Sequence, residues 1–231
     1  MKRFWTEAKT ASAGDGWTVL LDGRPVRTPA KRQVIVPVSK MAEAIAREWD
    51  AQDETIQPLS MPMTRAAATC LDRVAPEAKA VAANIASYGE TDLLCYRAEA
   101  PVALVDRQAH GWDPVLTWAR VALGAQLTVG TGVMHIAQSS EAVEALSREV
   151  SGLDPWRLTC LAELTTISGS LVLGLAVRHG RLDASEAWRL SRVDEDWNFE
   201  QWGEDHDAAE QAAKREAEFL HAAHVLELLD R

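Results

Sequence analysis

The chain has 231 residues, with 34 Asp and Glu against 24 Lys and Arg, so its formal net charge at pH 7 is −10. Nucleic acids and anionic membranes attract surfaces rich in Lys and Arg, so this charge argues against both as partners. Residues 181–231 alone carry 14 acidic and 6 basic side chains, a net charge of −8. An acidic carboxy-terminal part favours binding to a basic protein surface.

Cysteine usage and the amino terminus bear on the cellular location. The three cysteines are Cys70, Cys95 and Cys160. An odd, widely spaced set favours free thiols in a reducing compartment over a disulfide framework or a zinc site. The amino terminus has no apolar run typical of a signal peptide, and the apolar stretch 158–177 contains Glu163, which indicates a buried helix and not a membrane span. We therefore expect a cytoplasmic protein.

The first fifty residues predict a small antiparallel sheet followed by a helix. Residues 17–21 and 24–28 are expected to form a hairpin around the Asp22-Gly23 turn, because this pair tolerates positive φ. Residues 33–36 predict a further strand. Residues 3–10 are expected to pair on the other side of the hairpin. The helix is expected to begin with an N-cap at Ser39 and to end near Gln52. Its apolar stripe, in which Trp49 is expected to be buried, is Met41, Ile45 and Trp49.

The remainder of the chain is predicted to be mostly helical. Pro58 and Pro62 exclude a helix through residues 56–63, which are the predicted domain linker. Short segments at 92–96 and 126–129 fit either a strand or an extended connector. The predicted helices cover residues 64–74, 77–88, 107–122, 140–151, 155–178, 183–202 and 205–229. Strands followed by helices indicate an α+β chain, with a small β-rich amino-terminal domain at residues 1–60 and a helical carboxy-terminal domain at residues 61–231.

Two short segments carry more local predictions. Trp112-Asp113-Pro114 is typical of a helix start, with Asp113 as the cap and Pro114 in the first turn. Ser168-Gly169-Ser170 is expected inside the helix over 155–178, where small residues, Gly174 among them, allow close helix packing.

Motifs for catalysis and cofactor binding are missing from the sequence. There is no phosphate loop, no dinucleotide-binding glycine motif and no Gly-x-Ser-x-Gly nucleophile elbow. His206 has acidic neighbours, but the His and Glu spacing of a two-helix metal site is missing. His221 and His224 share a helical face without a carboxylate between them. We therefore expect no metal, no cofactor and no catalytic residues.

The segment from Asp194 to Asp207 holds seven carboxylates in fourteen positions, together with Trp197, Phe199 and Trp202. Two interpretations stand side by side. The segment is either a helix with an apolar stripe and a solvated acidic face, or a protein-binding patch in which aromatic rings supply contact area and acids select a basic partner. Gly203 is expected to end the helix, with Trp202 packing across that end.

Seven phrases, in order along the chain, resemble the ATP12 family of assembly chaperones for the F1 sector of ATP synthase. The likeness extends from Arg3 to about Asp207. The phrases lie at residues 21–29, 48–52, 61–64, 91–97, 108–114, 169–170 and 196–203.

The resemblance implies a non-enzymatic protein that binds the free F1 α subunit and shields its subunit-contacting surface until the β subunit replaces it. The family's acidic segment commonly reads Glu-Glu-Glu-Phe/Tyr-Gln before Trp-Gly, so Glu195 corresponds to its central acid. Asp for Glu and Asn for Gln shorten the reach of these side chains here. The residues expected to contact the partner are Asp194, Glu195, Asp196, Trp197, Asn198 and Trp202.

We also expect a monomer. Because mitochondrial members of the family carry transit peptides, we expect a bacterial relative. Two alternatives stay open. One is a small hydrolase that uses paired carboxylates, either Glu204 with Asp207 or Asp194 with Glu195. The other is an acidic adaptor that binds a different client.

Overall fold

The computed structural model describes residues 2–203 and 206–230. The chain packs into two compact units. The first unit comprises residues 1–78, 155–159 and 224–231, and the second comprises residues 79–154 and 160–223. The predicted domain boundary after residue 60 stays a prediction, because a packing unit need not be an independently folding domain.

The first unit contains a three-stranded antiparallel sheet, made of β1 (Ala8–Ala13), β2 (Gly16–Leu21) and β3 (Arg24–Pro25). As predicted, the β2–β3 turn is made by Asp22 and Gly23, both with positive φ. Residues 33–36 do not form the predicted strand; they contribute isolated bridges from Gln33 and Val36. Residues 3–10 were expected to pair with this sheet, and the pairing with β2 begins at Ala8, the first residue of β1.

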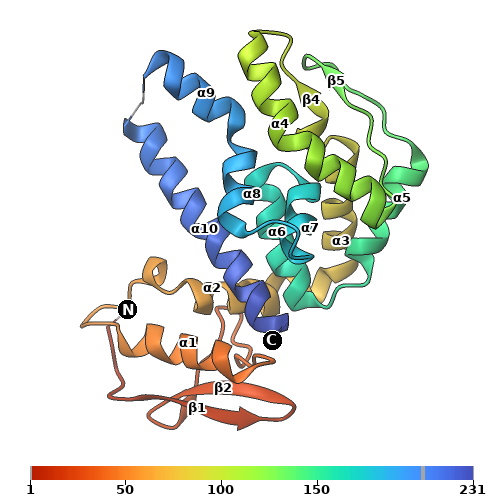
Figure 1. The fold of residues 1–231 in the computed structure, drawn as a ribbon. Coiled ribbons are helices and arrows are strands. Elements are labelled where there is room, and N and C mark those ends of the chain that lie inside the picture. The colour runs from red at the N-terminus through yellow and green to blue at the C-terminus, as the bar shows by residue number, and fades with distance from the viewer. Residues whose placement is uncertain (1, 204–205, 231) are drawn as a thin grey trace. The chain divides into compact units, whose positions relative to one another are not determined.

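Helix α1 (Ser39–Asp50) lies along β1 and β2, as Figure 1 shows. Met41 and Ile45 are fully buried, which confirms the apolar stripe at these two positions. Trp49 is only half-buried, in edge-to-face contact with Trp5, because it lies in the last turn of the helix. The N-cap prediction was wrong by one residue: the extended Val38 occupies the cap, and Ser39 is already helical.

A nearly continuous helical path follows the short 3-10 turn at Pro58–Ser60. Pro62 opens α2 (Pro62–Thr69), as a proline in the first turn of a helix allows. A short π-helix at Cys70–Val74 and a 3-10 turn at Ala75–Glu77 then lead into α3 (Ala78–Ser87).

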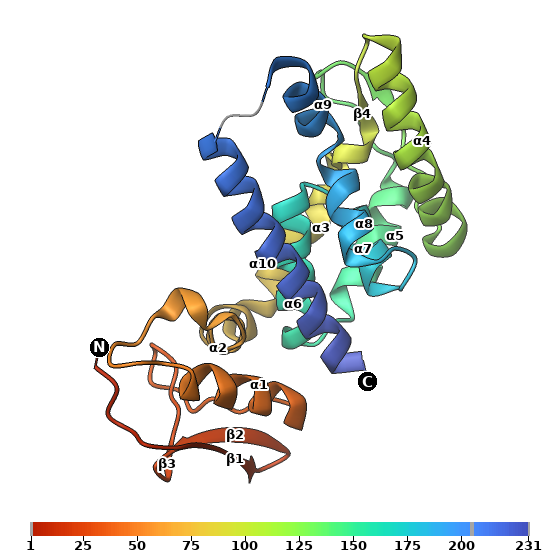
Figure 2. The same ribbon diagram turned by 60° about the vertical axis from the view of Figure 1, so that its left-hand side comes forward.

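The second unit is mainly helical, with one short parallel pair between β4 (Tyr96–Arg97) and β5 (Gly130–Thr131). Figure 2 shows α7 and α8 side by side. Trp112, Leu164 and Leu173 are among the fully buried core side chains. Short 3-10 turns occupy Tyr88–Glu90 and Leu93–Cys95, and a short π-helix occupies Ala119–Leu123. The remaining helices are α4 (Val102–Trp118), α5 (Ser140–Ser151), α6 (Pro155–Ser168), α7 (Leu171–Arg178), α8 (Ala184–Ser191), α9 (Val193–Trp202) and α10 (His206–Asp230).

Three predicted helices have different boundaries in the structure. The helix over 155–178 divides into α6 and α7, because Gly169 adopts a positive φ of 72°. The helix over 183–202 divides at Arg192, which leaves the helical conformation between α8 and α9. The helix over 107–122 begins five residues earlier, at Val102, so that Pro114 lies inside α4 and does not start it.

The observed order of elements confirms the predicted α+β class. None of the described helices is long and apolar enough to cross a membrane. Cys70, Cys95 and Cys160 are buried thiols that form no disulfide.

Candidate protein-binding site

The acidic-aromatic segment forms α9, a ten-residue helix with defined ends. Val193 is buried at its first position, and Gly203 ends it with a φ of 87°. Asp194, Glu195 and Asp196 occupy the first turn, where the positive end of the helix dipole favours carboxylates. The predicted helix stop at Gly203 is confirmed.

The inner side of α9 is fixed to α4 through Gln108, which is buried. The Gln108 side-chain amide donates to Oδ1 of Asp194 over 2.6 Å, and its carbonyl oxygen accepts from the Ala98 backbone N–H over 2.8 Å. Trp112, one helical turn further along α4, donates from Nε1 to the backbone carbonyl of Leu190 at the end of α8. These contacts set the start of α9 against the core of the second unit.

Arg107 makes the second connection between α4 and α9. Its guanidinium donates two hydrogen bonds to the carboxylate of Glu200, over 2.7 and 2.8 Å, and lies 5.0 Å from the centroid of the Trp197 ring. The hydrogen bond to Arg107 lowers the pKa of Glu200 below its ordinary value, and the same bond raises the pKa of Arg107. A bidentate pair with a stacked ring restricts how α9 can rotate on α4.

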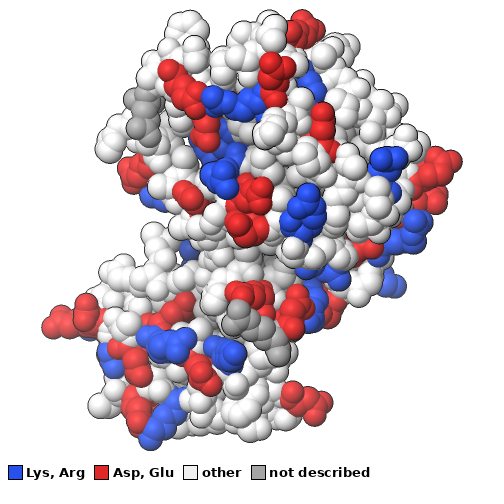
Figure 3. All heavy atoms as spheres, in the orientation of Figure 1, with Lys and Arg blue, Asp and Glu red and all other residues white. Residues whose placement is uncertain are grey.

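Arg192 contacts Asp196, the third acid of α9, and lies near Phe199, its second aromatic ring. Its Nε lies 3.3 Å from Oδ1 of Asp196, and its guanidinium stands near the rings of Trp188 and Phe199, at 5.4 and 5.6 Å. Figure 3 shows basic side chains gathered between α9 and α4, with acidic side chains beside them. Three arginine and amide contacts thus use the carboxylates of Asp194, Asp196 and Glu200.

The outer face of α9 consists of Glu195, Asn198 and Trp202. Their i, i+3, i+7 spacing places them on one side of the helix, and all three are exposed. Trp202 has 87% of its surface accessible, so the prediction that it packs across the helix end was wrong. Neither Glu195 nor Asn198 makes a side-chain hydrogen bond or an ion pair with the described residues.

The six residues predicted for partner contact therefore divide into two sets. Asp194 and Trp197 contact α4, and Asp196 contacts Arg192. Glu195, Asn198 and Trp202 remain available to another molecule. The supporting residues Gln108 and Arg107 were missed, because they lie 86 and 93 positions from their acidic partners and no local pattern connects them.

The arrangement gives little support to a carboxylate-dependent hydrolase. Asp194 and Glu195 are consecutive in a helix and project about 100° apart, one towards Gln108 and the other into solvent. The alternative pair of Glu204 with Asp207 involves Glu204, which lies outside the described residues. Among described residues, no group of three His, Cys, Asp or Glu side chains forms a candidate metal site.

The carboxylate of Asp92, in the second unit, is completely buried. It accepts hydrogen bonds from Ser170 Oγ (2.7 Å), the Val172 backbone N–H (3.0 Å) and the Leu94 backbone N–H (3.1 Å). Burial raises its pKa to about 6, and these hydrogen bonds act in the opposite direction by lowering the pKa. Through these hydrogen bonds, Asp92 connects the turn at Leu93–Cys95 to the start of α7. Its carboxylate has no exposed surface, so it does not contact a substrate. The positive φ of Gly169, and not the predicted close packing, lets the chain reach this carboxylate; Gly174, by contrast, lies against Leu161 as expected.

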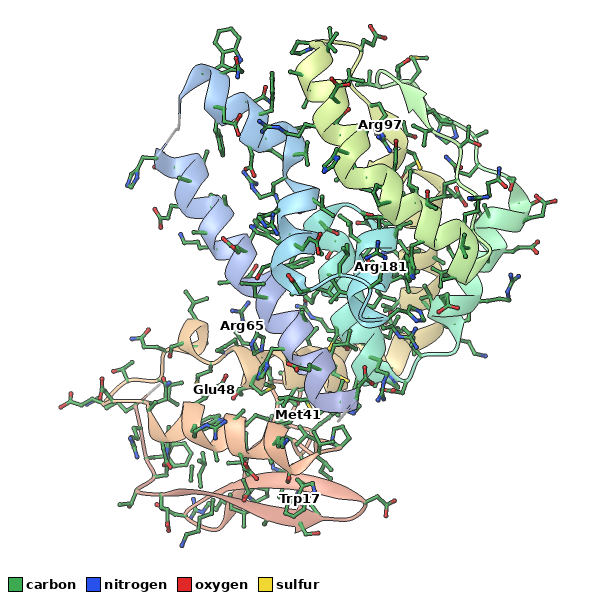
Figure 4. The ribbon with its side chains drawn as sticks, in the orientation of Figure 1. Trp17, Met41, Glu48, Arg65, Arg97 and Arg181 are labelled. Atoms are coloured by element: carbon green, nitrogen blue, oxygen red, sulfur yellow. The ribbon has the colours of Figure 1, made fainter. Side chains whose placement is uncertain are left out.

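Glu48 has a corresponding structural role in the first unit. Its carboxylate accepts the backbone N–H groups of Met63 and Thr64 and the Thr64 hydroxyl, over 2.6 to 2.8 Å, at the amino end of α2. Burial raises the pKa of this carboxyl. Figure 4 labels Glu48 on α1, and Arg97 in the second unit, where it contacts Asp113 over 2.8 Å and the Trp112 ring. The acid of the 48–52 phrase thus supports the fold.

Comparison with known proteins bears directly on these features. The family model of the ATP12 chaperone protein matches residues 2–120, just over half of the chain. The chain belongs to the ATP12 family. The mitochondrial protein atp12 of Schizosaccharomyces pombe is 24% identical over 221 residues, which are 90% of this chain and 76% of that protein.

Solved bacterial structures extend the ATP12 relationship over the whole chain. Atp12 from Paracoccus denitrificans is 47% identical, with a TM-score of 0.94, and the match covers 98% of this chain and 97% of that one. A lysine-for-aspartate variant of the same protein is 46% identical with the same TM-score and coverage. Atu1473 from Agrobacterium tumefaciens, described as a chaperone, is 43% identical with a TM-score of 0.93, over 99% of this chain and 86% of that one. The chain is thus a chaperone of the ATP12 type, and the predicted resemblance is confirmed.

Proposed function

We propose that this ATP12 chaperone binds the free α subunit of F1 ATP synthase and covers its subunit-contacting surface until the β subunit replaces it. The family resemblance supports the choice of client, and the exposed outer face of α9 supports this helix as the place where the client binds. We propose further that the chaperone acts as a cytoplasmic monomer and catalyses no reaction. Any effect of ATP on the complex is then expected to act through the client.

The observation that carries the proposal is the division of α9 into a fixed side and an exposed side. The contacts with Gln108, Arg107 and Arg192 hold the helix in one orientation. Glu195 and Trp202 therefore project from a helix whose backbone need not be ordered on binding, which lowers the entropic cost of binding. A carboxylate beside an exposed indole fits a client surface that combines a basic side chain with an apolar patch.

Separate expression of the two clients tests the choice of partner. The chaperone is co-purified with the α subunit alone and with the β subunit alone, at equal concentrations. We expect a complex with α and none with β. Equal capture of both subunits contradicts the proposal, and capture of neither favours an adaptor with another client.

Charge reversal tests the role of the outer face. Glu195→Lys is expected to weaken α binding by on the order of 2 kcal/mol, more than an exposed ion pair usually contributes. The matched control is Glu144→Lys, because Glu144 is also exposed on a helix of the second unit. Thermal melts of both variants should stay near that of the parent protein. Undiminished binding by Glu195→Lys would show that this acid is only part of a solvated face.

A further inference from the structure

The loop of residues 129–137, here called the apex loop, exposes apolar side chains that the protein itself does not cover. Val133 is 94% exposed and Met134 is 79% exposed. Val102, which follows β4 at the start of α4, is 73% exposed. Large apolar side chains that gather on exposed segments commonly mark a contact with another protein.

The apex loop is held in shape at its base. The backbone N–H of Thr128 donates to Oε1 of Gln138 over 2.7 Å, and Nε2 of Gln138 donates back to the Thr128 carbonyl over 3.0 Å. β5 pairs with β4, and the Gly132 N–H donates to the Arg97 carbonyl over 2.8 Å. Gly130 lies so close to the Ile136 side chain that an added Cβ would come within 2.7 Å of it. Val133 and Met134, here called the tip of the apex loop, therefore lie on a backbone with a defined shape.

The charged residues of the segments next to the tip in the sequence are acidic. Glu99 and Asp106 are exposed, and residues 98–106 contain no Lys or Arg; nor do residues 121–147. The two arginines that flank residues 98–106 are already engaged: Arg97 is buried against Asp113, and Arg107 is paired with Glu200. An apolar tip with acids beside it complements an apolar segment that carries basic side chains.

The tip lies at the same end of the second unit as the outer face of α9. Figures 1 and 2 both show the start of α4 and the end of α9 at this end of the unit. The contacts of Arg107 with Glu200 and of Gln108 with Asp194 also join the first turns of α4 to α9. A single partner can therefore touch both places.

From these observations we infer a second docking surface, consisting of Val102, Val133 and Met134 with Glu99 beside them. It binds an apolar, basic segment of the same client that contacts the outer face of α9. This inference rests on the proposed function, since it takes the client to be the F1 α subunit.

The test measures binding of the isolated α subunit to a Val133→Ser, Met134→Ser double variant. We expect the dissociation constant to rise by about tenfold or more, as for a contact near the centre of an interface. The thermal melt should be unchanged, because both side chains are exposed. The matched control is Leu59→Ser, which removes an apolar side chain with 85% exposure in the first unit and should change the constant by less than about twofold.

A charge variant gives an independent reading of the same surface. Glu99→Lys is expected to weaken α binding and to reduce its dependence on salt, while Glu144→Lys leaves both unchanged.

The possible outcomes separate the second surface from the proposed function. If the parent protein binds α and the double variant binds equally well, the second surface is wrong and the proposed function stands. If the parent protein does not bind α, both are wrong. A loss of binding by Leu59→Ser as large as that of the double variant also overturns the inference. So does a concentration-dependent dimer of the parent protein that the double variant abolishes, because the tip would then join two copies of the chain.

Discussion

Two kinds of carboxylate in this ATP12 chaperone can be compared directly. Glu48 and Asp92 are buried or half-buried, and each accepts three hydrogen bonds from backbone and hydroxyl donors. Glu195 stands on the exposed side of α9 and makes no such bond with the described residues. All three belong to segments that resemble the family. Segments that resemble the family thus contain both acids whose hydrogen bonds stabilise the fold and an acid whose side chain stays exposed, and the hydrogen bonds distinguish the two kinds.

The largest expected effect comes from Asp92→Ala. This change leaves Ser170 Oγ and the backbone N–H groups of Val172 and Leu94 without their buried acceptor. We expect the free energy of unfolding, measured by urea titration, to fall by about 3 kcal/mol or more. Asp106→Ala, at an exposed acid of the same unit, should change it by less than about 0.5 kcal/mol. Similar values for the two variants would erase the distinction between buried and exposed acids.

Glu48→Ala should have the next largest effect. The amino end of α2 loses the acceptor for two backbone N–H groups and for the Thr64 hydroxyl. We expect a loss of about 2 kcal/mol in the urea titration, and a smaller loss for Glu48→Gln, whose amide oxygen keeps part of the acceptor capacity. If Gln and Ala cost the same, the carboxylate does not act as a cap.

The pH dependence of stability should reveal the buried acid. The pKa of Asp92 is raised from 3.8 to about 6 by burial, so the folded protein holds a proton that the unfolded chain releases between those values. The contribution of Asp92 to stability therefore falls as the pH rises from about 4 to 6 and is constant above. Compared with Asp92→Asn, the parent protein should lose about 3 kcal/mol across this window, since each pKa unit corresponds to about 1.4 kcal/mol. Parallel stability curves for the two proteins would contradict the assignment.

The smallest effect on stability is expected for Trp202→Ala. The indole is almost fully exposed, so the free energy of unfolding should change by less than about 0.5 kcal/mol, while capture of the α subunit falls. Trp49→Ala is the contrasting variant: its ring contacts Trp5, and its loss should cost about 2 kcal/mol without changing α capture. A destabilisation by Trp202→Ala as large as that by Trp49→Ala would place Trp202 in the fold and not on the binding face.

Local patterns in the sequence were sufficient for some elements and not for others. The β2–β3 hairpin, α1 and α5 follow from turn pairs and apolar periodicity within a few residues. The break between α6 and α7 does not, because the helical pattern continues through Gly169 and the deciding acceptor, Asp92, lies 78 residues from Ser170. Pro114 misled for the same reason: its local signal marks a helix start, whereas the surrounding packing carries α4 through it.

The candidate site shows the same limit. The spacing of Glu195, Asn198 and Trp202 is visible in the sequence as one helical face. Which acids of α9 are already engaged is not visible, because that depends on Gln108 and Arg107 in a distant helix. Sequence reasoning therefore singled out the segment that is proposed here as the site, but it could not divide that segment into an inner and an outer side.

The paired amide contacts between Thr128 and Gln138 bear on the kinetics of association. They close a loop of about ten residues at its base, so the ordering of this loop takes place when the chaperone folds and not when it meets a client. A surface shaped in advance should bind in a single step whose observed rate rises linearly with client concentration. A loop that had to close on the client would instead reach a limiting rate at high concentration.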